Sequence, residues 1–477
     1  MMQIIQKKTK AKVFENLGQH QKFIFFILFA VLIAGIVFIK IFGILKISLS
    51  VMYVLEIIVF LSISVNLLLY FLSIISNYLK KISANNERVI FPSTPNYSVS
   101  IIVPAFNEER VISQTVYSLL RINYTNLKEI ICVDDGSSDK TYDVLVEQFS
   151  LNKKIKIVRK TNGGKASALN EGIKQATGKI IVVIDADTVI MPSSLNYLLK
   201  AFSDKKVGAV SGQMCVGNEI SSSPSLVAMQ SADYLLANNI DRKGLSLINC
   251  MTVIPGAIGA YRSHILRKLG GYDEDTLAED ADLTIRILKL GYKIVHEPKA
   301  IALTEAPDCM KDFIKQRMRW CYGKTQVLWK HRYIAFHKQY GLFGWLGYPI
   351  AIVSQVIIPP FLLIIDLMPI LLLGLIAAHI HYHNLSKVIW QSTHTFIFLV
   401  LLFQLIYYIN LLYASRLLEK KEQKISSINF ICSQFFLRGM SSIVCLITIY
   451  KILSGKKQQW NKLDRLGTVN VQISVDN

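Results

Sequence analysis

Acidic residues and paired cysteines are scarce in this sequence. Its 477 residues include 33 Asp and Glu against 53 Lys and Arg, so the formal net charge is +20. The seven cysteines are scattered without a CxxC pair, which argues against a cysteine-rich metal site and favours reduced, packed thiols in a cytoplasmic domain. The sequence also lacks GxGxxG and GxxxxGKS/T, so nothing in it supports a dinucleotide-binding or P-loop protein.

The basic residues that cause this excess lie beside long hydrophobic runs. Lysines cluster within residues 7–22, at Lys80 and Lys81, and at Lys456 and Lys457. Positive flanks are typical of the cytoplasmic side of membrane proteins, where anionic lipid headgroups attract them. We therefore expect membrane lipid as a partner and no binding of nucleic acid.

Hydrophobic residues make up 52% of the chain and concentrate near its two ends. Residues 23–44 and 52–75 are each long enough to span a bilayer, and their basic flanks predict a hairpin with both ends inside. No small-residue cleavage pattern follows the first run, so we expect an anchor and not a signal peptide.

The C-terminal apolar runs predict several more passes, whose topology stays open. Residues 341–382 are apolar for about two passes, and 394–414 and 428–453 for one each. The basic loop 415–424 and the basic tail both favour the cytoplasm, so either 428–453 re-enters without crossing or one basic segment lies outside. The predicted organisation is a basic cytoplasmic tail (1–22), a two-helix transmembrane hairpin (23–78), a linker (79–97), a globular domain (98–330), interfacial and transmembrane helices (331–455) and a basic tail (456–477).

The globular domain has an alternating α/β pattern. Short apolar runs at 99–103, 129–133, 155–158 and 180–184 alternate with helix-like segments at 108–121, 139–150 and 165–176. This order predicts a parallel sheet wound by right-handed crossovers, with ligands bound at the carboxyl ends of its strands.

The notable polar residues of the domain follow these predicted strands. Pro104, Phe106 and Glu108 follow the first strand, Asp134 and Asp135 end the second, and Asp185 and Asp187 end the fourth. Because alternate side chains of a strand share a face, Asp185 and Asp187 can reach one point. Two carboxylates with few other ligands suit Mg²⁺ or Mn²⁺ shared with substrate phosphates.

Two glycine-containing stretches each have a functional and an ordinary interpretation. Gly163-Gly164 permits a tight turn that would bring Lys165 to the sheet edge where phosphate charge arrives, or it is a plain turn with a solvated lysine. Residues 253–262 (VIPGAIGAYR) would form a floor for a sugar or its acceptor, or a turn at the edge of the sheet.

The stretch 275–320 carries the other candidate residues on two predicted helices. Thr276 and Glu279 read as a capping box that places Asp280 in a first turn, and Gly291 ends that helix. Gln316, Arg319 and Trp320 stand at i, i+3 and i+4, so they share one helical face. An Arg fork suits phosphate oxygens and an indole suits the apolar face of a sugar ring, so this face fits a sugar diphosphate.

The combination Asp134-Asp135-Gly136, Asp185-x-Asp187, Glu279-Asp280 and Gln316-x-x-Arg319-Trp320 resembles the membrane-bound, processive family 2 glycosyltransferases. These include cellulose, chitin and hyaluronan synthases and, most similar here, bacterial poly-β-1,6-N-acetylglucosamine synthases. The resemblance covers residues 98–330. It implies a GT-A, Rossmann-like nucleotide-sugar domain in the cytoplasm, inserted between N-terminal and C-terminal transmembrane helices of a multi-pass protein of the cell membrane.

The resemblance also implies a role for each matching residue. The nucleotide of a UDP-sugar would be contacted by Asp134 or Asp135, by Lys165, and by Pro104, Phe106 and Glu108. Asp187, with Asp185 nearby, would hold the metal and diphosphate, and Gln316 and Arg319 the pyrophosphate. Asp280, beside Glu279, would be the general base, and Trp320 would stack on the acceptor. The chain departs from the common Thr-Glu-Asp motif at Ala278, which removes a hydroxyl but keeps the acid.

The implied activity is processive, inverting transfer from a UDP-sugar, with UDP-N-acetylglucosamine as best guess, to a growing β-linked polysaccharide that is exported across the membrane. An accessory membrane subunit would be a further partner. The alternatives are transfer of one sugar to a lipid carrier, synthesis of a hyaluronan, cellulose or chitin type of polymer, and a non-catalytic membrane scaffold or transporter with a transferase-like domain.

Overall fold

The structure is a computed structural model that describes residues 49–86, 96–218, 225–367, 387–416, 429, 432–456, 458, 465 and 467–469. It divides into two compact units, Met1–Ser62 with Phe361–Gln404 and Ile63–Pro360 with Leu405–Asn477. The predicted N-terminal tail, the first predicted span and most of the loop 415–424 lie outside the described residues. All site residues predicted above lie in the second unit.

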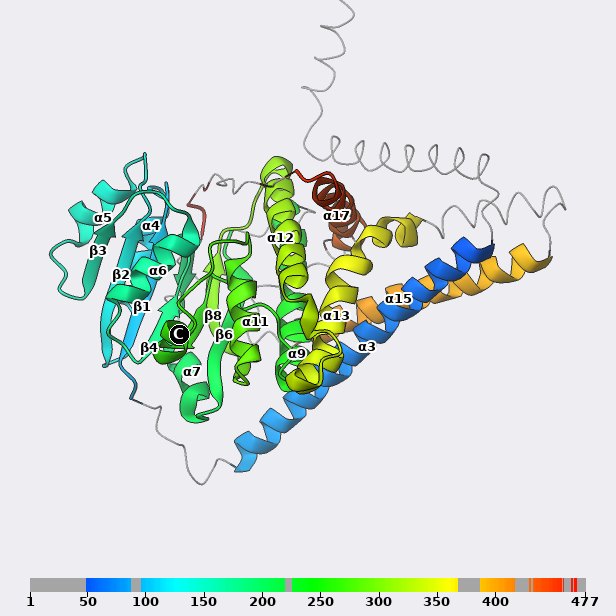
Figure 1. The fold of residues 1–477 in the computed structure, drawn as a ribbon, viewed down its shortest axis with the longest axis horizontal. Coiled ribbons are helices and arrows are strands. Elements are labelled where there is room, and N and C mark those ends of the chain that lie inside the picture. The colour runs from blue at the N-terminus through cyan, green and yellow to red at the C-terminus, as the bar shows by residue number, and fades with distance from the viewer. Residues whose placement is uncertain are drawn as a thin grey trace, which may run out of the picture. The chain divides into compact units, whose positions relative to one another are not determined.

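An eight-stranded sheet in the order β3-β2-β1-β4-β7-β6-β8-β5 organises the second unit (Figure 1). β1 pairs in parallel with β2 and β4, and β2 pairs in parallel with β3, so the four predicted strands form the predicted parallel sheet. The strands are β1 Val99–Ala105, β2 Leu127–Asp134, β3 Ile155–Arg159, β4 Ile180–Val183, β5 Thr188–Ile190, β6 Val207–Val216, β7 Gly259–Arg262 and β8 Lys293–Thr304.

The other half of the sheet is mixed, which the apolar runs did not predict. β7 pairs antiparallel with β4 and with β6, β6 pairs in parallel with β8, and β5 pairs antiparallel with β8. Residues 259–262 therefore lie inside the sheet, whereas 253–258 form the loop and turn that lead into β7, so the turn interpretation holds only for the first part of the stretch 253–262.

Helices cover both faces of the sheet and bury its apolar residues. Ile102, Ile131 and Val183 point to the face covered by α6, α10 and α11. Val103, Ile130 and Val182 point to the opposite face, covered by α4, α5 and α7. These helices are α4 Ile112–Leu120, α5 Thr141–Phe149, α6 Lys165–Gln175, α7 Ser194–Lys200, α10 Ser263–Lys268 and α11 Glu279–Lys289.

A long helix, α12, packs against α11 on one side and α17 on the other (Figure 1). It thereby connects the sheet domain with an apolar helix. The remaining α-helices are α3 Leu49–Asn86, α8 Leu226–Leu236, α9 Lys243–Leu247, α12 Met310–Lys330, α13 Tyr348–Ile352, α15 Lys387–Arg416 and α17 Arg438–Leu453. Short 3-10 helices occupy Ala201–Ser203, Arg332–Ile334 and Lys338–Tyr340, and π-helices occupy Ala237–Arg242, Phe343–Gly347, Val353–Ile357 and Ser433–Leu437.

Apolar helices occur on both sides of the sheet domain in the sequence. Among the described residues, Val54–Lys80, Phe396–Arg416 and Phe435–Leu453 are long and apolar enough to cross a membrane. Phe343–Ile357 and Pro359–Leu367 form a bent pair that counts as a fourth candidate if it is one span. These segments coincide with the predicted runs at 52–75, 394–414, 428–453 and the first part of 341–382.

Candidate active site

A cavity of about 130 Å³ opens at the carboxyl ends of β1, β2 and β4. This is the edge at which the strand pattern predicted a ligand. Eight of the predicted residues line it, namely Pro104, Phe106, Glu108, Asp135, Lys165, Asp185, Asp187 and Arg319. The other predicted residues, Asp134, Glu279, Asp280, Gln316 and Trp320, are not among the residues that line it.

The two aspartates that follow β2 have different surroundings. Asp134 is fully buried, and Arg159 Nε lies 3.3 Å from its Oδ2. Asp135 lines the cavity and accepts hydrogen bonds from Lys160 Nζ at 2.7 Å and from the backbone N–H of Gly164 at 2.7 Å. Of the two residues left open by the sequence, Asp135 is therefore the one placed to meet a ligand.

Lys165, the first residue of α6, joins the end of β4 to the start of α11. Its Nζ lies 2.5 Å from Asp185 Oδ1 and 3.6 Å from Glu279 Oε1. Burial opposes its charge, but Asp185 and Glu279 raise the pKa of Lys165, which stays cationic. The interpretation of Lys165 as a solvated lysine after a plain turn is therefore wrong.

Residue Gly256 lies directly against this ion pair. A Cβ added there would stand 2.6 Å from Lys165 Nζ and 3.1 Å from Asp185 Oδ1, so the Lys165 side chain would have to shift. The backbone of the 253–262 stretch therefore approaches the site closely.

Asp187 is a largely buried carboxylate at the cavity. Its side chain is 8% exposed, and its Oδ1 accepts hydrogen bonds from the hydroxyls of Thr188 at 3.1 Å and Thr304 at 3.4 Å. Its Oδ2 lies 2.5 Å from Nη2 of Arg465, a residue of the basic C-terminal tail. The carboxylate thus already pairs with a cation through one of its two oxygens.

The acidic side chains at the cavity fit a weakly ligated divalent ion. Within the described part of the chain, no group of three or more His, Cys, Asp or Glu side chains could hold a metal by itself. Mg²⁺ and Mn²⁺ commonly bind through one or two carboxylates plus substrate phosphates. Asp187 and Asp185 supply such a pair, although each is paired with a basic side chain here.

Helix α11 starts at Glu279 and places Asp280 in its first turn, as predicted. The predicted capping box is wrong, because Ala278 occupies the N-cap position and its methyl group cannot accept a hydrogen bond. Burial and the Asp280 carboxylate raise the pKa of Glu279, while Lys165 and Arg319 oppose this rise. Gly291, with φ at +81°, follows the end of the helix, as predicted.

The Gln-Arg-Trp triplet lies on α12 in the predicted helical arrangement. Arg319 lines the cavity, whereas Gln316 is buried and its Oε1 accepts no hydrogen bond from the residues that the structure describes. The ring of Trp320 lies beside Tyr234, with a centroid distance of 6.4 Å, and under the guanidinium of Arg317 at 5.0 Å. Only Arg319 of the three meets the cavity directly.

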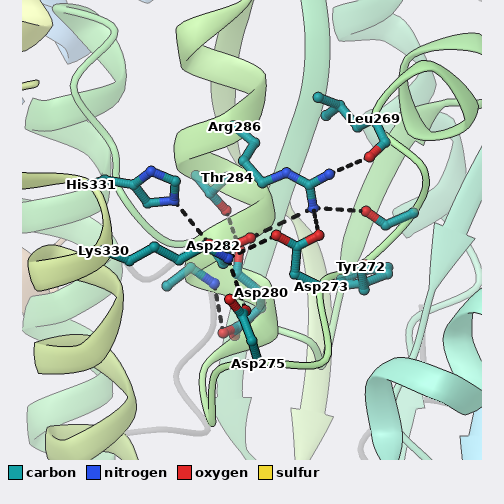
Figure 2. Close-up of polar contacts among 12 residues, drawn as sticks. Leu269, Tyr272, Asp273, Asp275, Asp280, Asp282, Thr284, Arg286, Lys330 and His331 are labelled. Carbon is teal, nitrogen blue, oxygen red and sulfur yellow. Dashed lines mark hydrogen bonds and ion pairs between the residues drawn. The ribbon is translucent and has the colours of Figure 1, made fainter.

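A buried ionic network holds α11 against the end of α12 (Figure 2). Asp282, which is fully buried, lies 2.9 Å from Nε2 of His331, 3.0 Å from Nζ of Lys330 and 3.6 Å from Nη1 of Arg286. Asp273 also belongs to the network, with Lys330 Nζ at 2.7 Å and Arg286 Nη1 at 2.8 Å from its carboxylate. The network fixes the helix that begins with Glu279 and Asp280.

Arg465 was not predicted as a site residue. The tail 456–477 was predicted only as a basic cytoplasmic segment, yet Arg465 lines the cavity. Although burial opposes its charge, Asp187, Glu108 and Glu305 raise the pKa of Arg465. The only signal was a Gly-Thr-Val sequence at 467–469 after a charged stretch, which is too short to predict docking.

Comparison with known proteins agrees with the fold. Residues 95–323 match a family described as Glycosyltransferase like family 2. The chain is 33% identical over 232 residues to a poly-beta-1,6-N-acetyl-D-glucosamine synthase of Staphylococcus epidermidis (48% of this chain, 55% of that protein). It is 37% identical over 239 residues to the probable glycosyltransferase YdaM of Bacillus subtilis (49% and 56%). The chain thus matches just over half the length of these relatives.

A solved structure shares the fold. The mannosyltransferase PcManGT from Pyrobaculum calidifontis, in complex with GDP-Man and Mn²⁺, superposes with a TM-score of 0.50. The match covers 83% of this chain and 100% of that one at 18% sequence identity. The likeness therefore concerns the arrangement of sheet and helices, which is of the GT-A type.

Proposed function

Residues 95–323 form a family 2 glycosyltransferase-like domain, and from this premise we propose that the protein extends a β-linked polysaccharide with sugar from a UDP-sugar. UDP-N-acetylglucosamine is the proposed donor. The similarity to poly-beta-1,6-N-acetyl-D-glucosamine synthases supports this choice of sugar. Transfer is proposed to invert the anomeric centre, to be processive and to be coupled to export.

The observation that carries the proposal is the composition of one cavity. Residues from β1, β2, β4, α6 and α12 meet there, and they include carboxylates (Asp135, Asp185, Asp187) beside cations (Lys165, Arg319). A nucleotide diphosphate with a divalent ion carries both signs of charge and needs both kinds of partner. Asp135 would contact the nucleoside, and Pro104, Phe106 and Glu108 would line its other side.

The residues of the site divide the work of a single displacement. Asp187 and Asp185 would hold Mg²⁺ or Mn²⁺, which when bound neutralises the diphosphate. Arg319 and Lys165 would bind the diphosphate oxygens and stabilise the charge that develops as the bond to the anomeric carbon breaks. The Mn²⁺ and GDP-Man bound to PcManGT support a divalent metal and a nucleotide sugar here.

Asp280 is the proposed general base. The acceptor hydroxyl oxygen forms the new bond to the anomeric carbon, UDP leaves from the opposite face, and the hydroxyl proton passes to the Asp280 carboxylate. Asp280 follows Glu279, whose Oε1 lies 3.6 Å from Lys165 Nζ, so the base stands next to the ion pair at the cavity. Trp320 would stack on the terminal sugar of the acceptor, and Gln316 would support the pyrophosphate.

The apolar helices support a place in the cell membrane. Three candidate spans flank or follow the domain in the sequence, and lysines such as Lys80 lie at their ends. We propose a multi-pass protein with the transferase domain in the cytoplasm, in contact with anionic lipid and with an accessory membrane subunit.

The test is a donor panel on the purified full-length protein. UDP release would be measured with several UDP-sugars and Mg²⁺ or Mn²⁺, and the products digested with linkage-specific glycoside hydrolases. The expected result is metal-dependent UDP release with UDP-N-acetylglucosamine and a long product cut by a β-1,6-specific hydrolase. Release with only single-sugar products would favour transfer to a lipid carrier, and no release with any donor would contradict a catalytic role.

A further inference from the structure

The end of the described chain docks at the cavity edge. We use the name C-terminal segment for Arg465 and Gly467–Val469. Arg465 Nη2 lies 2.5 Å from Asp187 Oδ2, and its Nη1 donates a hydrogen bond of 2.7 Å to the backbone oxygen of Glu305. Both side chains of the ion pair are largely buried, with 14% of Arg465 and 8% of Asp187 exposed. A buried charge pair of this kind requires a fixed geometry.

The backbone of the C-terminal segment is anchored by the same acidic residue. Gly467 donates its N–H to Glu305 Oε2 at 2.9 Å, and its φ is +72°, a conformation that favours glycine. Thr468 Oγ1 accepts a hydrogen bond of 3.2 Å from Asn218 Nδ2. The segment is therefore also held by the residues that follow Arg465.

The surface that contacts the C-terminal segment includes an apolar pocket for Val469. Val469 is 5% exposed and packs with Val189, Cys215 and Leu303. A Cβ added at Gly217 would lie 2.8 Å from Cγ1 of Val469, so the absence of a side chain at 217 makes the space for this valine. An apolar socket of this kind is built by residues of β5, β6 and β8.

Arg465 and a divalent ion would compete for Asp187. The Arg465 guanidinium already occupies Oδ2 of Asp187 at 2.5 Å, and Mg²⁺ needs a carboxylate oxygen at about 2.0–2.1 Å. Two cations on one oxygen repel each other strongly. The cavity, at about 130 Å³, is also smaller than the roughly 300–1,000 Å³ usual for small-molecule pockets, and Arg465 is one of its lining residues.

We propose that Arg465 is a built-in counter-cation for Asp187, which the divalent ion displaces and which then binds the diphosphate of the donor in the same cavity. This role rests on the proposed function, since it assumes a metal-bound nucleotide sugar. Only the Arg465 side chain changes partner, while Gly467 and Val469 keep the segment docked.

A coupling between metal and nucleotide follows. When the metal ion binds without a nucleotide, it must displace Arg465 from Asp187. The Arg465 guanidinium then has no anionic partner and faces the metal ion. When a diphosphate arrives with the metal, its negative charge gives Arg465 a new partner. Metal and UDP should therefore each strengthen the binding of the other, and by linkage the two effects are equal.

The experiment measures Mn²⁺ binding to the full-length protein by electron paramagnetic resonance of free Mn²⁺, with and without UDP. Arg465→Gln is compared with wild type and with Arg319→Gln, which removes a guanidinium from the same cavity without touching Asp187. Without UDP, we expect Arg465→Gln to bind Mn²⁺ roughly tenfold more tightly than wild type, and Arg319→Gln less than about threefold more tightly. The strengthening of Mn²⁺ binding by UDP should be smaller in Arg465→Gln.

Val469→Ser provides a second variant that leaves every charge in place. It should loosen the C-terminal segment and tighten Mn²⁺ binding in the same direction as Arg465→Gln. Equal Mn²⁺ affinity in wild type, Arg465→Gln and Val469→Ser would overturn the role of Arg465, and so would an equal gain in Arg319→Gln. A lack of Mn²⁺ binding by all variants, even with UDP, would instead contradict the metal assignment in the proposed function and remove the basis of this role.

Discussion

At the scale of single residues, the Asp187 carboxylate is held by several polar contacts at the cavity. Two threonine hydroxyls and the Arg465 guanidinium converge on its carboxylate, which is nearly inaccessible to solvent. These contacts hold the side chain in one orientation before any ligand binds. Preorganised charge of this kind stabilises a transition state without the cost of reorienting groups during the reaction.

Asp187→Asn keeps the shape of the side chain and removes its charge. We expect UDP release to fall by about 100- to 1,000-fold, the usual effect of losing one preorganised electrostatic contact. Steady-state UDP release at saturating Mn²⁺ measures the change. Asp204→Asn is the control, because Asp204 is an exposed partner of Lys293 and its loss should change the rate less than about twofold. Activity of Asp187→Asn above half that of wild type would contradict the role of Asp187.

Trp320→Ala should reduce chain extension more than donor hydrolysis. The indole stands beside Tyr234 near the cavity, where it would stack on the acceptor and not on the donor. The expected loss in extension is roughly tenfold, the size of one aromatic stacking contact. Trp329→Ala is a matched control, since Trp329 lies on the same helix and is 69% exposed. Equal losses in extension and in hydrolysis would argue against acceptor stacking.

The site was predictable from the sequence where a residue's position follows from its strand or helix. Asp135, Asp185 and Asp187 follow predicted strands, and all three line the cavity. Arg465 was not predictable, because its contact joins the tail to the end of β4 through side chains whose sequence context has no regular pattern. The distinction between Asp134 and Asp135 also required coordinates, since both follow the same strand.

At the scale of elements, α11 matters most because it carries Glu279 and Asp280. Its start is not set by a side-chain cap, so its position depends on packing and on the network around Asp282 (Figure 2). Burial opposes ionisation of Asp282, but hydrogen bonds from His331 and Lys330 prevail and lower its pKa. The position of α11 therefore depends on the ionised carboxylate of Asp282, which is stabilised only while its hydrogen bonds from His331 and Lys330 are present.

Asp282→Asn should destabilise the protein by about 3 kcal/mol, since removing one member of a buried ionic group leaves its partners uncompensated. Thermal unfolding in detergent measures the loss. Asp275→Asn is the control, because Asp275 contacts the same Lys330 at 2.8 Å but is largely exposed, and its loss should cost less than about 1 kcal/mol. Equal losses in the two variants would contradict a special role for the buried carboxylate.

The contribution of Asp282 should also depend on pH. A carboxyl whose pKa is lowered by folding stabilises the protein above its unfolded pKa, about 3.9, and this stabilisation is lost as the pH falls through the lower folded value. The difference in unfolding temperature between wild type and Asp282→Asn should therefore be full near pH 6 and shrink below about pH 4. A difference that grows on acidification would contradict this assignment.

The parallel half of the sheet was predictable because buried parallel strands are continuous apolar runs. The mixed half was not, because β7 is only Gly259–Arg262 and closely follows Pro255 and Gly256. Such a sequence favours a turn, and only pairing with β4 on one side and β6 on the other makes it a strand. The prediction of a capping box was wrong because Glu279 is the first residue of the helix. Its carboxylate pairs with Lys165 and does not cap the helix.

At the scale of the whole molecule, the described part of the chain has three helices long and apolar enough to cross a membrane, and basic residues such as Lys80 lie at their ends. The formal net charge of +20 also favours an anionic donor such as a nucleotide diphosphate sugar. Candidate spans occur before and after the transferase domain in the sequence. The predicted number of crossings stays a prediction, because composition alone cannot decide whether the run at 428–453 crosses.

The proposed orientation predicts the outcome of protease treatment of sealed vesicles. Trypsin should cut the domain at residues 98–330 in inside-out vesicles and leave it intact in right-side-out vesicles, because positive flanks such as Lys80 and Lys81 stay in the cytoplasm. Immunoblotting with an antibody to the domain reads out the fragments. Protection in inside-out vesicles would place the domain on the opposite side from the UDP-sugar pool and contradict the proposal.

The most direct measurement compares UDP binding and sugar transfer in wild type and Asp280→Asn, on the same samples with Mn²⁺ and UDP-N-acetylglucosamine. Because Asp280 would act only on the acceptor proton, the variant should bind UDP within about threefold of wild type, while transfer falls by about 100- to 10,000-fold. Transfer by Asp280→Asn at a rate near that of wild type would contradict the account, as would the absence of metal-dependent UDP binding by wild type.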